Sequence, residues 1–218
     1  MTATKQKTKL FANGNLKLDK SVGIFSLPPV KTCTNCSTCS KTCYALQAYT
    51  QYTRARIAWD NNYELSLSDA FVEEVCEQIK HSRKVIYRLH NSGDFYSEEY
   101  INKWREIIKN NPDKKFYTYT KNKLALTLND MDNCNVIYSF INGYRNYGSE
   151  EYCNLLHDKF GAYVCQIDKS KHEKCMRECK ECLHNDKVAI VIHGNKSKKD
   201  TYEDKVIEEL KKLPDYIG

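Results

Sequence analysis

The sequence contains no run of about 18 consecutive apolar residues, the length that a membrane-spanning helix requires. Its first residues are polar and rich in lysine, and they lack the apolar core of a secretory signal. It also shows no low-complexity tract, no obvious internal repeat, and no recognition-helix or zinc-finger pattern typical of nucleic-acid readers. These absences predict a cytoplasmic protein with no membrane partner.

The length and charge of the chain predict one domain but do not identify its binding partner. A chain of 218 residues is long enough for one sizeable core, so we expect a single α/β domain over 1–218. The formal charge of +6 is spread along the chain, with excesses at 5–20, 109–123 and 196–199. Such charge runs usually lie on a solvated surface. An unknown small molecule or a nucleic acid stays open as a partner, because the 16 tyrosines offer stacking faces beside the lysines.

The first notable feature is a group of four cysteines, in the loop 28–43, that follows an expected strand. Neighbouring loop positions rarely offer the geometry of an unstrained disulfide, whereas C-x2-C and C-x3-C steps wrap a chain around an inorganic centre. The spacing C-x2-C-x2-C-x3-C is also that of a bacterial ferredoxin ligand set. It therefore favours an iron-sulfur cluster, with zinc or structural disulfides as alternatives. The predicted metal ligands are Cys33, Cys36, Cys39 and Cys43.

A second cysteine group lies late in the chain, in the segment 165–186. Eleven cysteines in a reducing compartment favour metal binding over a disulfide framework. Four ligands complete a closed site, for which we expect a second iron-sulfur cluster, with structural zinc as the alternative. The remaining thiols, including Cys76 on the apolar stripe of a helix, are expected to be packing residues. The predicted ligands of this second site are Cys165, Cys175, Cys179 and Cys182.

Strands and helices are expected to alternate after a polar arm or edge hairpin at 1–20. This alternation implies right-handed crossovers and a mainly parallel sheet. Six strands suit an open sheet or an incomplete barrel better than a closed one with eight strands. The expected strands are 22–27, 84–90, 115–120, 135–140, 161–166 and 187–193. The expected helices are 44–59, 64–80, 97–110, 122–130, 149–159 and 201–213.

Polar residues follow two of these strands, at the edge where parallel sheets build their sites. By the period of two, Arg88 and His90 share one strand face and would point at the site. Gly93 permits a close backbone approach, while Ser92 and Asp94 can cap the next helix. The alternatives are a capped turn with a solvent-facing Asp94, or an Arg88–Asp94 pair that braces the loop.

The second polar stretch is the strand from Tyr117 to Lys121. Tyr117, Tyr119 and Lys121 share one face, and Thr118 and Thr120 share the other, which indicates a polar cavity rather than a dry core. The predicted cofactor-binding residues are Arg88, His90, Ser92, Gly93, Asp94, Tyr119 and Lys121. Catalytic residues stay unknown.

Several of these motifs resemble the phage gene product 88-like family. They are Thr32-Cys33 through Cys43-Tyr-Ala, Arg88-x-His-x-Ser-Gly-Asp-Phe95, Tyr100-x3-Trp104 and Phe116-x-x-Tyr-Thr-Lys121, followed by the late cysteines. Their order is also similar, more distantly, to radical S-adenosylmethionine enzymes. That similarity implies a six-unit parallel partial (β/α) barrel and a [4Fe-4S] cluster on the first cysteines. It also places Gly93 and Asp94 near the amino-acid part of S-adenosylmethionine. A phage-encoded protein would work in the host cytoplasm.

The number of ligands on the first cluster separates the functional alternatives. Three cysteine ligands leave one iron open for S-adenosylmethionine and favour an enzyme, whereas a fourth ligand closes the site. The spacing here is C-x2-C-x3-C at Cys36, Cys39 and Cys43, with Cys33 available as the fourth ligand. A closed site favours a non-catalytic iron-sulfur protein that transfers electrons, senses or associates with nucleic acid. A zinc-stabilised nucleic-acid-binding or regulatory module is the alternative of a different class.

Overall fold

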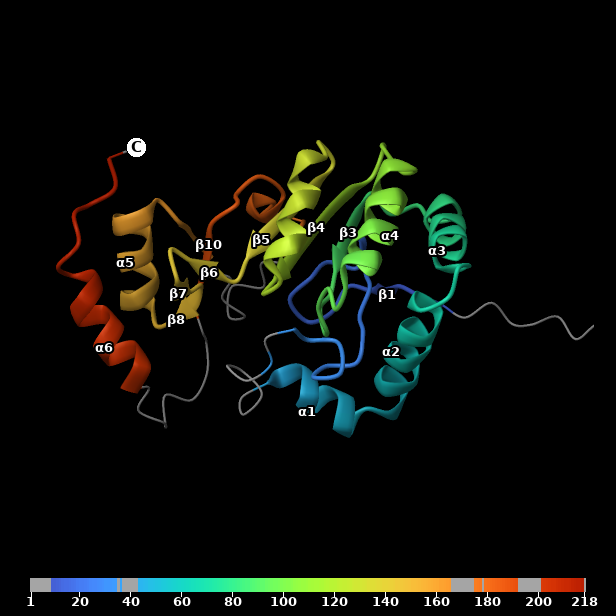
Figure 1. The fold of residues 1–218 in the computed structure, drawn as a ribbon, viewed down its shortest axis with the longest axis horizontal. Helices are drawn as coiled ribbons and strands as arrows, with labels where there is room; N and C mark the ends of the chain where they lie inside the picture. The colour runs from blue at the N-terminus through green and yellow to red at the C-terminus, as the bar shows by residue number, and fades with distance from the viewer. Residues whose placement is uncertain are drawn as a thin grey trace, which may run out of the picture.

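The computed structural model describes residues 9–34, 36, 43–165, 175–177, 179–191 and 201–217. Its main sheet has five strands in the spatial order β1-β2-β3-β4-β5 (Figure 1). These are β1 (Ala12–Asn13), β2 (Val22–Ile24), β3 (Ile86–Leu89), β4 (Lys115–Thr120) and β5 (Cys134–Tyr138). The β1–β2 pair is antiparallel and the other three pairs are parallel. The sheet is therefore mixed, with its antiparallel pair at one edge.

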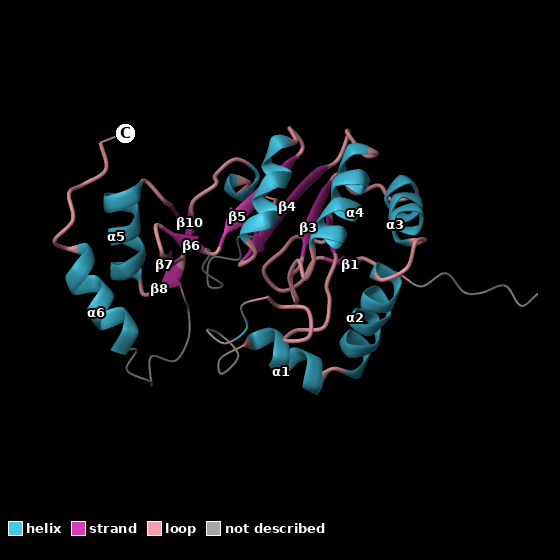
Figure 2. Cartoon of the chain, in the orientation of Figure 1, coloured by secondary structure: helices cyan, strands magenta, loops and turns pink. Residues whose placement is uncertain are grey.

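Three helices cover one face of this sheet, namely α3 (Phe71–Lys80), α4 (Glu98–Lys109) and the 3₁₀ helix η3 (Lys123–Asp130) (Figure 2). The stripe Phe71, Val75 and Ile79 recurs at helical spacing and is fully buried. Helix α4 starts where the Ser97 hydroxyl accepts a hydrogen bond of 3.1 Å from the backbone N–H of Tyr100. The main core fills the space between these helices and the sheet.

The expected helix 44–59 is divided into two. Helix α1 (Tyr44–Gln51) ends at Tyr52, whose extended backbone (φ −110, ψ 96) interrupts the helical path before α2 (Thr53–Ser66). The buried residues of α2 are Asn62 and Ser66, both polar. The Asn62 amide donates to the carbonyls of Leu10 and Ser26, so it ties this helix to the chain on both sides of β2.

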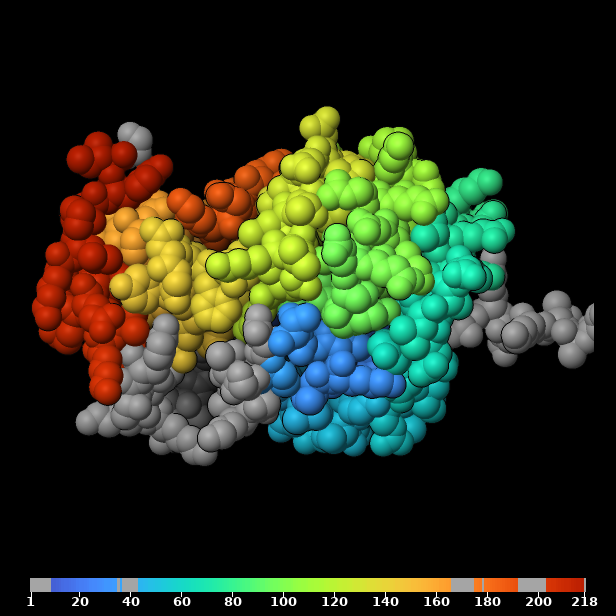
Figure 3. Space-filling view, in the orientation of Figure 1, coloured from blue at the N-terminus to red at the C-terminus, as the bar shows by residue number. Residues whose placement is uncertain are grey.

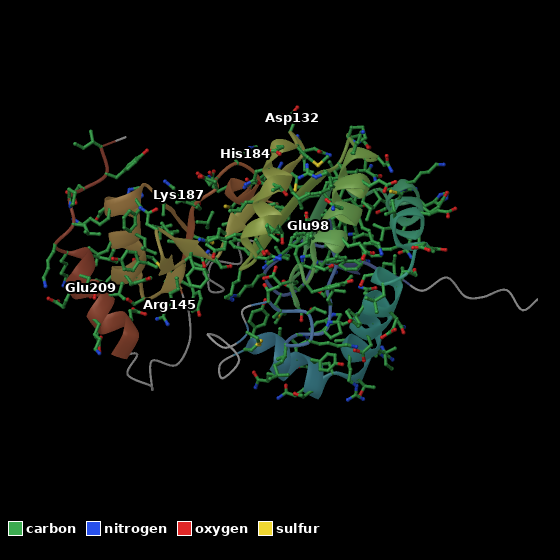
Figure 4. The ribbon with its side chains drawn as sticks, viewed as in Figure 1. Glu98, Asp132, Arg145, His184, Lys187 and Glu209 are labelled. Atoms are coloured by element: carbon green, nitrogen blue, oxygen red, sulfur yellow. The ribbon has the colours of Figure 1, made fainter. Side chains whose placement is uncertain are left out.

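A second, smaller sheet lies at the other end of the molecule (Figure 1). Its parallel strands, in spatial order, are β8 (Tyr147–Gly148), β10 (Val188–Val191) and β9 (Tyr163–Cys165). Helix α5 (Glu150–Phe160) connects β8 to β9, and α6 (Thr201–Leu210) packs against α5. Arg145, labelled in Figure 4, holds α6 in place through an ion pair of 3.1 Å with Glu203.

The predicted six-unit parallel partial barrel is wrong. After β5 the chain makes an antiparallel hairpin, β6 (Phe140–Ile141) and β7 (Tyr144–Arg145), whose turn residues Asn142 and Gly143 have φ of 48° and 90°. Two successive positive φ angles form a tight turn that reverses the chain. The two strands expected at 161–166 and 187–193 then pair in the smaller sheet instead of extending the main one. The Asn-Gly pair was the local signal for this reversal.

No helix in the described ranges is both long and apolar enough to cross a membrane. Of the two structures expected for 1–20, an arm or an edge hairpin, the described residues show an edge strand whose partner lies beyond residue 20: β1 pairs antiparallel with β2, and the turn between them begins at Gly14, whose φ is 56°. The space-filling view shows the segment 179–191, in orange, at the surface between α5 and the region of η3 and β5 (Figure 3). This segment carries the end of the second cysteine group.

Candidate metal centre

The face of the main sheet opposite α3 and α4 carries a second buried cluster. Val22 and Ile24 of β2, Tyr117 of β4 and Ile137 of β5 belong to it, together with late-chain residues that include Cys175 and Cys182. Arg88 lies in the same row of the sheet, between Ile24 and Tyr117. The predicted face of Tyr117 and Tyr119 is therefore the face that meets the second cysteine group.

Backbone contacts fold the late cysteines into a compact turn. Cys175 forms bridges with Leu18 and with Cys179, and the N–H of Met176 donates to the carbonyl of Cys179 at 2.7 Å. Met176 has a φ of 69°, so the chain reverses sharply between the two cysteines. The 3₁₀ helix η5 (Glu181–Leu183) then carries Cys182 back toward the sheet.

Asn135 of β5 fastens this turn to the main sheet. Its amide nitrogen donates to the carbonyl of Cys182 at 3.0 Å and to that of Asn185 at 2.9 Å. The same residue pairs with Tyr117 in the sheet register. A single side chain from the edge strand thus positions the end of the cysteine segment over the row of Arg88 and Tyr117.

The thiols of this group contact one another and nearby hydroxyls. The Cys175 and Cys182 side chains form a hydrogen bond, which is the main reason that the pKa of Cys182 falls to about 7 and that of Cys175 rises. The Tyr119 hydroxyl lies 2.9 Å from the Cys182 sulfur, and the Tyr163 hydroxyl lies 3.7 Å from the Cys179 sulfur. Cys165 acts electrostatically on Cys175, and both Cys165 and Cys179 act on the Tyr163 hydroxyl, so the four cysteines lie in one neighbourhood.

Arg88 brings a positive charge to this neighbourhood. Its guanidinium carbon lies 5.4 Å from the centre of the Tyr119 ring and 5.9 Å from that of Tyr117. Burial lowers the pKa of Arg88, but Tyr117, Tyr44, Tyr119 and Cys175 raise it, so the net shift is upward and Arg88 stays charged. None of these neighbours is a carboxylate, and its Nε has no hydrogen-bond partner among the described residues.

The donor set fits a thiolate-bound metal, but its side chains are not gathered at one point. Within the described ranges, no three or more His, Cys, Asp or Glu side chains are arranged to hold a metal ion. The Cys175 and Cys182 side chains form a hydrogen bond with each other, whereas the Cys179 sulfur lies beside the Tyr163 hydroxyl.

The first cysteine group is described in part, since Cys39 lies outside the described residues. Cys43 caps helix α1, where its sulfur accepts a contact of 3.4 Å from the N–H of Leu46. The next residue, Tyr44, donates its hydroxyl to the carbonyl of Asn91 at 2.7 Å. Cys43 itself forms no disulfide bond with the described residues. The cluster on this group stays a prediction.

His90 does not share a face with Arg88, so that expectation is wrong. Strand β3 ends at Leu89, and His90 has a φ of 56°, which turns its side chain to the helix-covered face. There its Nε2 lies 2.9 Å from the Tyr100 hydroxyl, and its ring packs edge-on against Phe95 at 4.4 Å. Burial lowers the pKa of His90 to about 3. The period of two fails because the left-handed residue ends the strand geometry.

Asp94 is buried, so the alternative in which it faces solvent is wrong. It connects the loop 90–95 to the end of strand β4. Its carboxylate accepts hydrogen bonds from the Thr120 hydroxyl at 2.5 Å, the Lys121 N–H at 2.8 Å and the Phe95 N–H at 2.7 Å. Burial raises the pKa of Asp94, and these donors oppose that rise. The predicted Arg88–Asp94 pair is not observed. Helix α4 is capped by Ser97, not by Asp94.

Of the remaining predicted cofactor residues, Ser92, Gly93 and Lys121 lie in or beside this brace. Gly93 has a φ of 77°, and a Cβ there would lie 2.5 Å from the Thr32 hydroxyl, so the close approach is made to the chain itself. Ser92 is buried, and its carbonyl accepts from the Leu27 N–H at 2.9 Å. Loop 90–95 therefore packs against the turn that precedes the first cysteines. Arg88 and Tyr119 are brought to the second cysteine group instead.

Comparison with known proteins defines the family. The family model described as Gene product 88 matches residues 1–211. The chain belongs to the gene product 88 family. The Gene 88 protein of Mycobacterium phage L5 is 29% identical over 98 residues, which cover 40% of this chain and 41% of that protein. The alignment thus spans less than half the length of this relative. No solved structure matches the chain.

For this gene product 88 family member, the predicted family resemblance is confirmed. The more distant similarity to radical S-adenosylmethionine enzymes finds no support in the comparisons or in the sheet topology. Two residues of the site were missed, Asn135 and Tyr163. Asn135 lies 47 residues before Cys182 and Tyr163 lies 16 residues before Cys179, so spacing along the sequence gave no signal for either contact.

Proposed function

We propose that this protein is an iron-sulfur protein, and that Cys165, Cys175, Cys179 and Cys182 bind one of its clusters on the open face of the main sheet. The observation that carries the proposal is the environment of Arg88. A partly buried cation whose described neighbours are hydroxyls and a thiol needs a negative charge. A cluster bound by four thiolates is an anion, and its charge would be balanced there.

The chain topology supports the same site. Leu18 holds Cys175 through a backbone bridge, and the side-chain amide of Asn135 holds the carbonyl of Cys182 beside the main sheet. Met176, with its positive φ, reverses the chain within the segment. The C-x3-C and C-x2-C steps suit a closed set of four thiolates. Such a set also suits zinc, which is the alternative for this second site.

The first cysteine group is proposed to bind a second [4Fe-4S] cluster, on the strength of its ferredoxin-like spacing. Binding of S-adenosylmethionine by Gly93 and Asp94 has little support, because both carboxylate oxygens of Asp94 already accept hydrogen bonds from the chain. We therefore propose an iron-sulfur protein in which four cysteines close each cluster and which is not an enzyme. An electron-transfer or sensing role follows from the chemistry of the clusters.

Anaerobic purification with iron, sulfide and zinc analysis tests the proposal. We expect about eight iron atoms and eight sulfides per chain if both groups hold cubane clusters. Cys182→Ser should remove about four of each. Cys153→Ala is the matched control, because this thiol is buried in α5 and should leave the iron content unchanged. Zinc without sulfide would overturn the iron-sulfur assignment.

A charge variant tests the observation that carries the proposal. Arg88→Met keeps a long side chain that can pack on Tyr117 and Tyr119, but it removes the charge. If Arg88 balances a cluster, the variant should lose iron at the second site faster under a chelator than the wild type. Arg54→Met, on an exposed position of α2, should behave as the wild type.

A further inference from the structure

Helices α1 and α2 carry a row of aromatic side chains that take no part in the candidate metal centre. Along α2, Trp59 and Tyr63 follow the capping residue Tyr52 at helical spacing, so the three rings lie on one side of the helix. Tyr49 of α1 stacks on Trp59, with ring centres 6.1 Å apart and planes inclined by 18°. The two helices lie in the lower part of the molecule in Figure 2, and Tyr52 is 62% exposed. The row therefore reaches the surface.

Positive side chains lie beside this aromatic row. Residues 20–59 contain five Lys or Arg and no Asp or Glu, although the whole chain has 28 acidic residues. Arg56 is exposed and lies one helical turn beyond Tyr52, on the side of the row. The Nζ of Lys31 lies 4.0 Å from the centre of the Tyr63 ring. A cation thus accompanies each end of the row.

Two acidic side chains contact these residues, and both are engaged within the chain. Asp60 accepts a hydrogen bond of 2.6 Å from the Tyr49 hydroxyl, which holds the Tyr49 ring in place. This hydrogen bond raises the pKa of Tyr49 and Arg56 opposes the rise, so Arg56 lies close to the Tyr49 hydroxyl. Glu64 forms an ion pair of 3.9 Å with Lys31, and an exposed pair of this kind is weak and easily exchanged for another anion.

We propose that this aromatic row binds single-stranded DNA. Aromatic rings beside Lys and Arg suit a single strand, because unpaired bases stack on the rings while the cations meet the phosphates. The hydroxyls of Tyr49 and Thr50 already donate to groups of the chain, so neither is available to select the 2′-hydroxyl of RNA. This activity goes beyond the iron-sulfur assignment and does not depend on it.

The length of the row sets the length of the strand that it can hold. Tyr52 and Tyr63 are eleven positions apart in the sequence, which corresponds to about 16 Å along a helix. A stacked strand covers this length with about five nucleotides. An oligodeoxythymidylate of about ten nucleotides is therefore long enough to occupy the row as a probe.

Tryptophan fluorescence tests the stacking in the full-length protein purified anaerobically. The chain has two tryptophans, of which Trp104 is fully buried in the core and Trp59 belongs to the row. Adding the oligodeoxythymidylate to the wild type should quench the emission of Trp59. Trp59→Phe keeps an aromatic ring, so it should still bind a labelled strand, followed by fluorescence anisotropy, but without this quenching. Binding that leaves the wild-type emission unchanged would overturn the proposal.

Variants of single residues separate the roles of ring and charge. Tyr52→Ala should weaken binding about tenfold because one base loses its stacking partner, whereas Tyr52→Phe should bind as the wild type. Arg56→Gln should make the slope of log K against log salt concentration shallower by about 0.7, the value for one phosphate contact of a single strand. Arg54→Gln is the matched control, because Arg54 is exposed on the same helix but points to a different side. Equal changes of slope in the two arginine variants would overturn the site.

Other nucleic acids provide the remaining comparisons. A wild-type protein that does not bind the oligodeoxythymidylate refutes the proposal, whatever its iron content. Equally tight binding of a DNA duplex of the same length would refute stacking on the row, because a duplex offers its phosphates but hides the faces of its bases. Tighter binding of an oligouridylate of the same length would overturn the choice of DNA over RNA.

Discussion

Replacing Asp94 by Asn should destabilise the protein without affecting its metal content. Asp94 accepts from the Lys121 N–H at 2.8 Å through one oxygen, and from the Thr120 hydroxyl and the Phe95 N–H through the other. In the variant one oxygen becomes an amide nitrogen, which faces the Lys121 N–H or one of the other donors. The lost hydrogen bond to a charged group contributes about 1.5 to 3 kcal/mol.

This loss can be measured by urea and thermal unfolding, followed by circular dichroism. For a chain of this length, it corresponds to a fall of about 4 to 9 °C in the melting temperature. Asp113→Asn is the control, because Asp113 is exposed and forms a surface ion pair of 2.8 Å with Lys114, so the melting temperature of this variant should stay close to that of the wild type.

A double-mutant cycle with Thr120→Val should give an interaction energy of at least about 0.5 kcal/mol, because the two side chains share a hydrogen bond. An Asp94→Asn protein as stable as the wild type, or one that loses iron while remaining folded, would refute the assignment of Asp94 to a structural brace.

Three further predictions concern other parts of the chain. The folded-state pKa of His90, about 3, lies below its value in the unfolded chain. The contribution of neutral His90 to the free energy of unfolding should therefore be complete above about pH 6.5 and fall by up to about 1.4 kcal/mol per pH unit toward pH 3. Chemical unfolding across that pH range should show a flatter dependence for His90→Gln. Gly93→Ala should lower the unfolding free energy by about 1 to 3 kcal/mol, because φ is 77° and the new methyl group would overlap Thr32; unchanged stability would contradict the loop geometry. Cys43→Ala should lose cluster iron, whereas Cys76→Ala should only weaken packing; equal iron losses in the two variants would exclude Cys43 as a specific ligand.

Local structure was largely predictable because each element has its own periodicity. The strand expected at 115–120 coincides with β4, and the helix expected at 97–110 contains α4, whose buried stripe includes Trp104. Sheet assembly was not predictable in the same way. The tight turn at Asn142-Gly143 reverses the chain after β5, so the later strands leave the main sheet. The regular alternation of strands and helices in the sequence did not indicate this change of direction.

In the candidate site, too, the sequence predicted side-chain positions only where the strand is regular. The face of Tyr117 and Tyr119 followed from the strand period, because β4 is regular through both residues. The face of His90 did not, because a single left-handed residue ends β3. The contacts of Asn135 and Tyr163 with the cysteine segment join residues far apart in the chain, and spacing along a sequence carries no signal for such contacts.

The strand order of the smaller sheet has a consequence for how the chain folds. Strand β10 lies between β8 and β9, yet it follows both of them in the sequence. Until residues 188–191 have been synthesised, β8 and β9 have no common neighbour, and the segment with the late cysteines is a loop with one free end. Its closure by β10 brings Tyr163 and Cys165 into register with Val188 and Ile190. During translation, this part of the protein should therefore acquire its structure last, and a metal that reaches the cysteines early would join the two ends of an unfinished sheet.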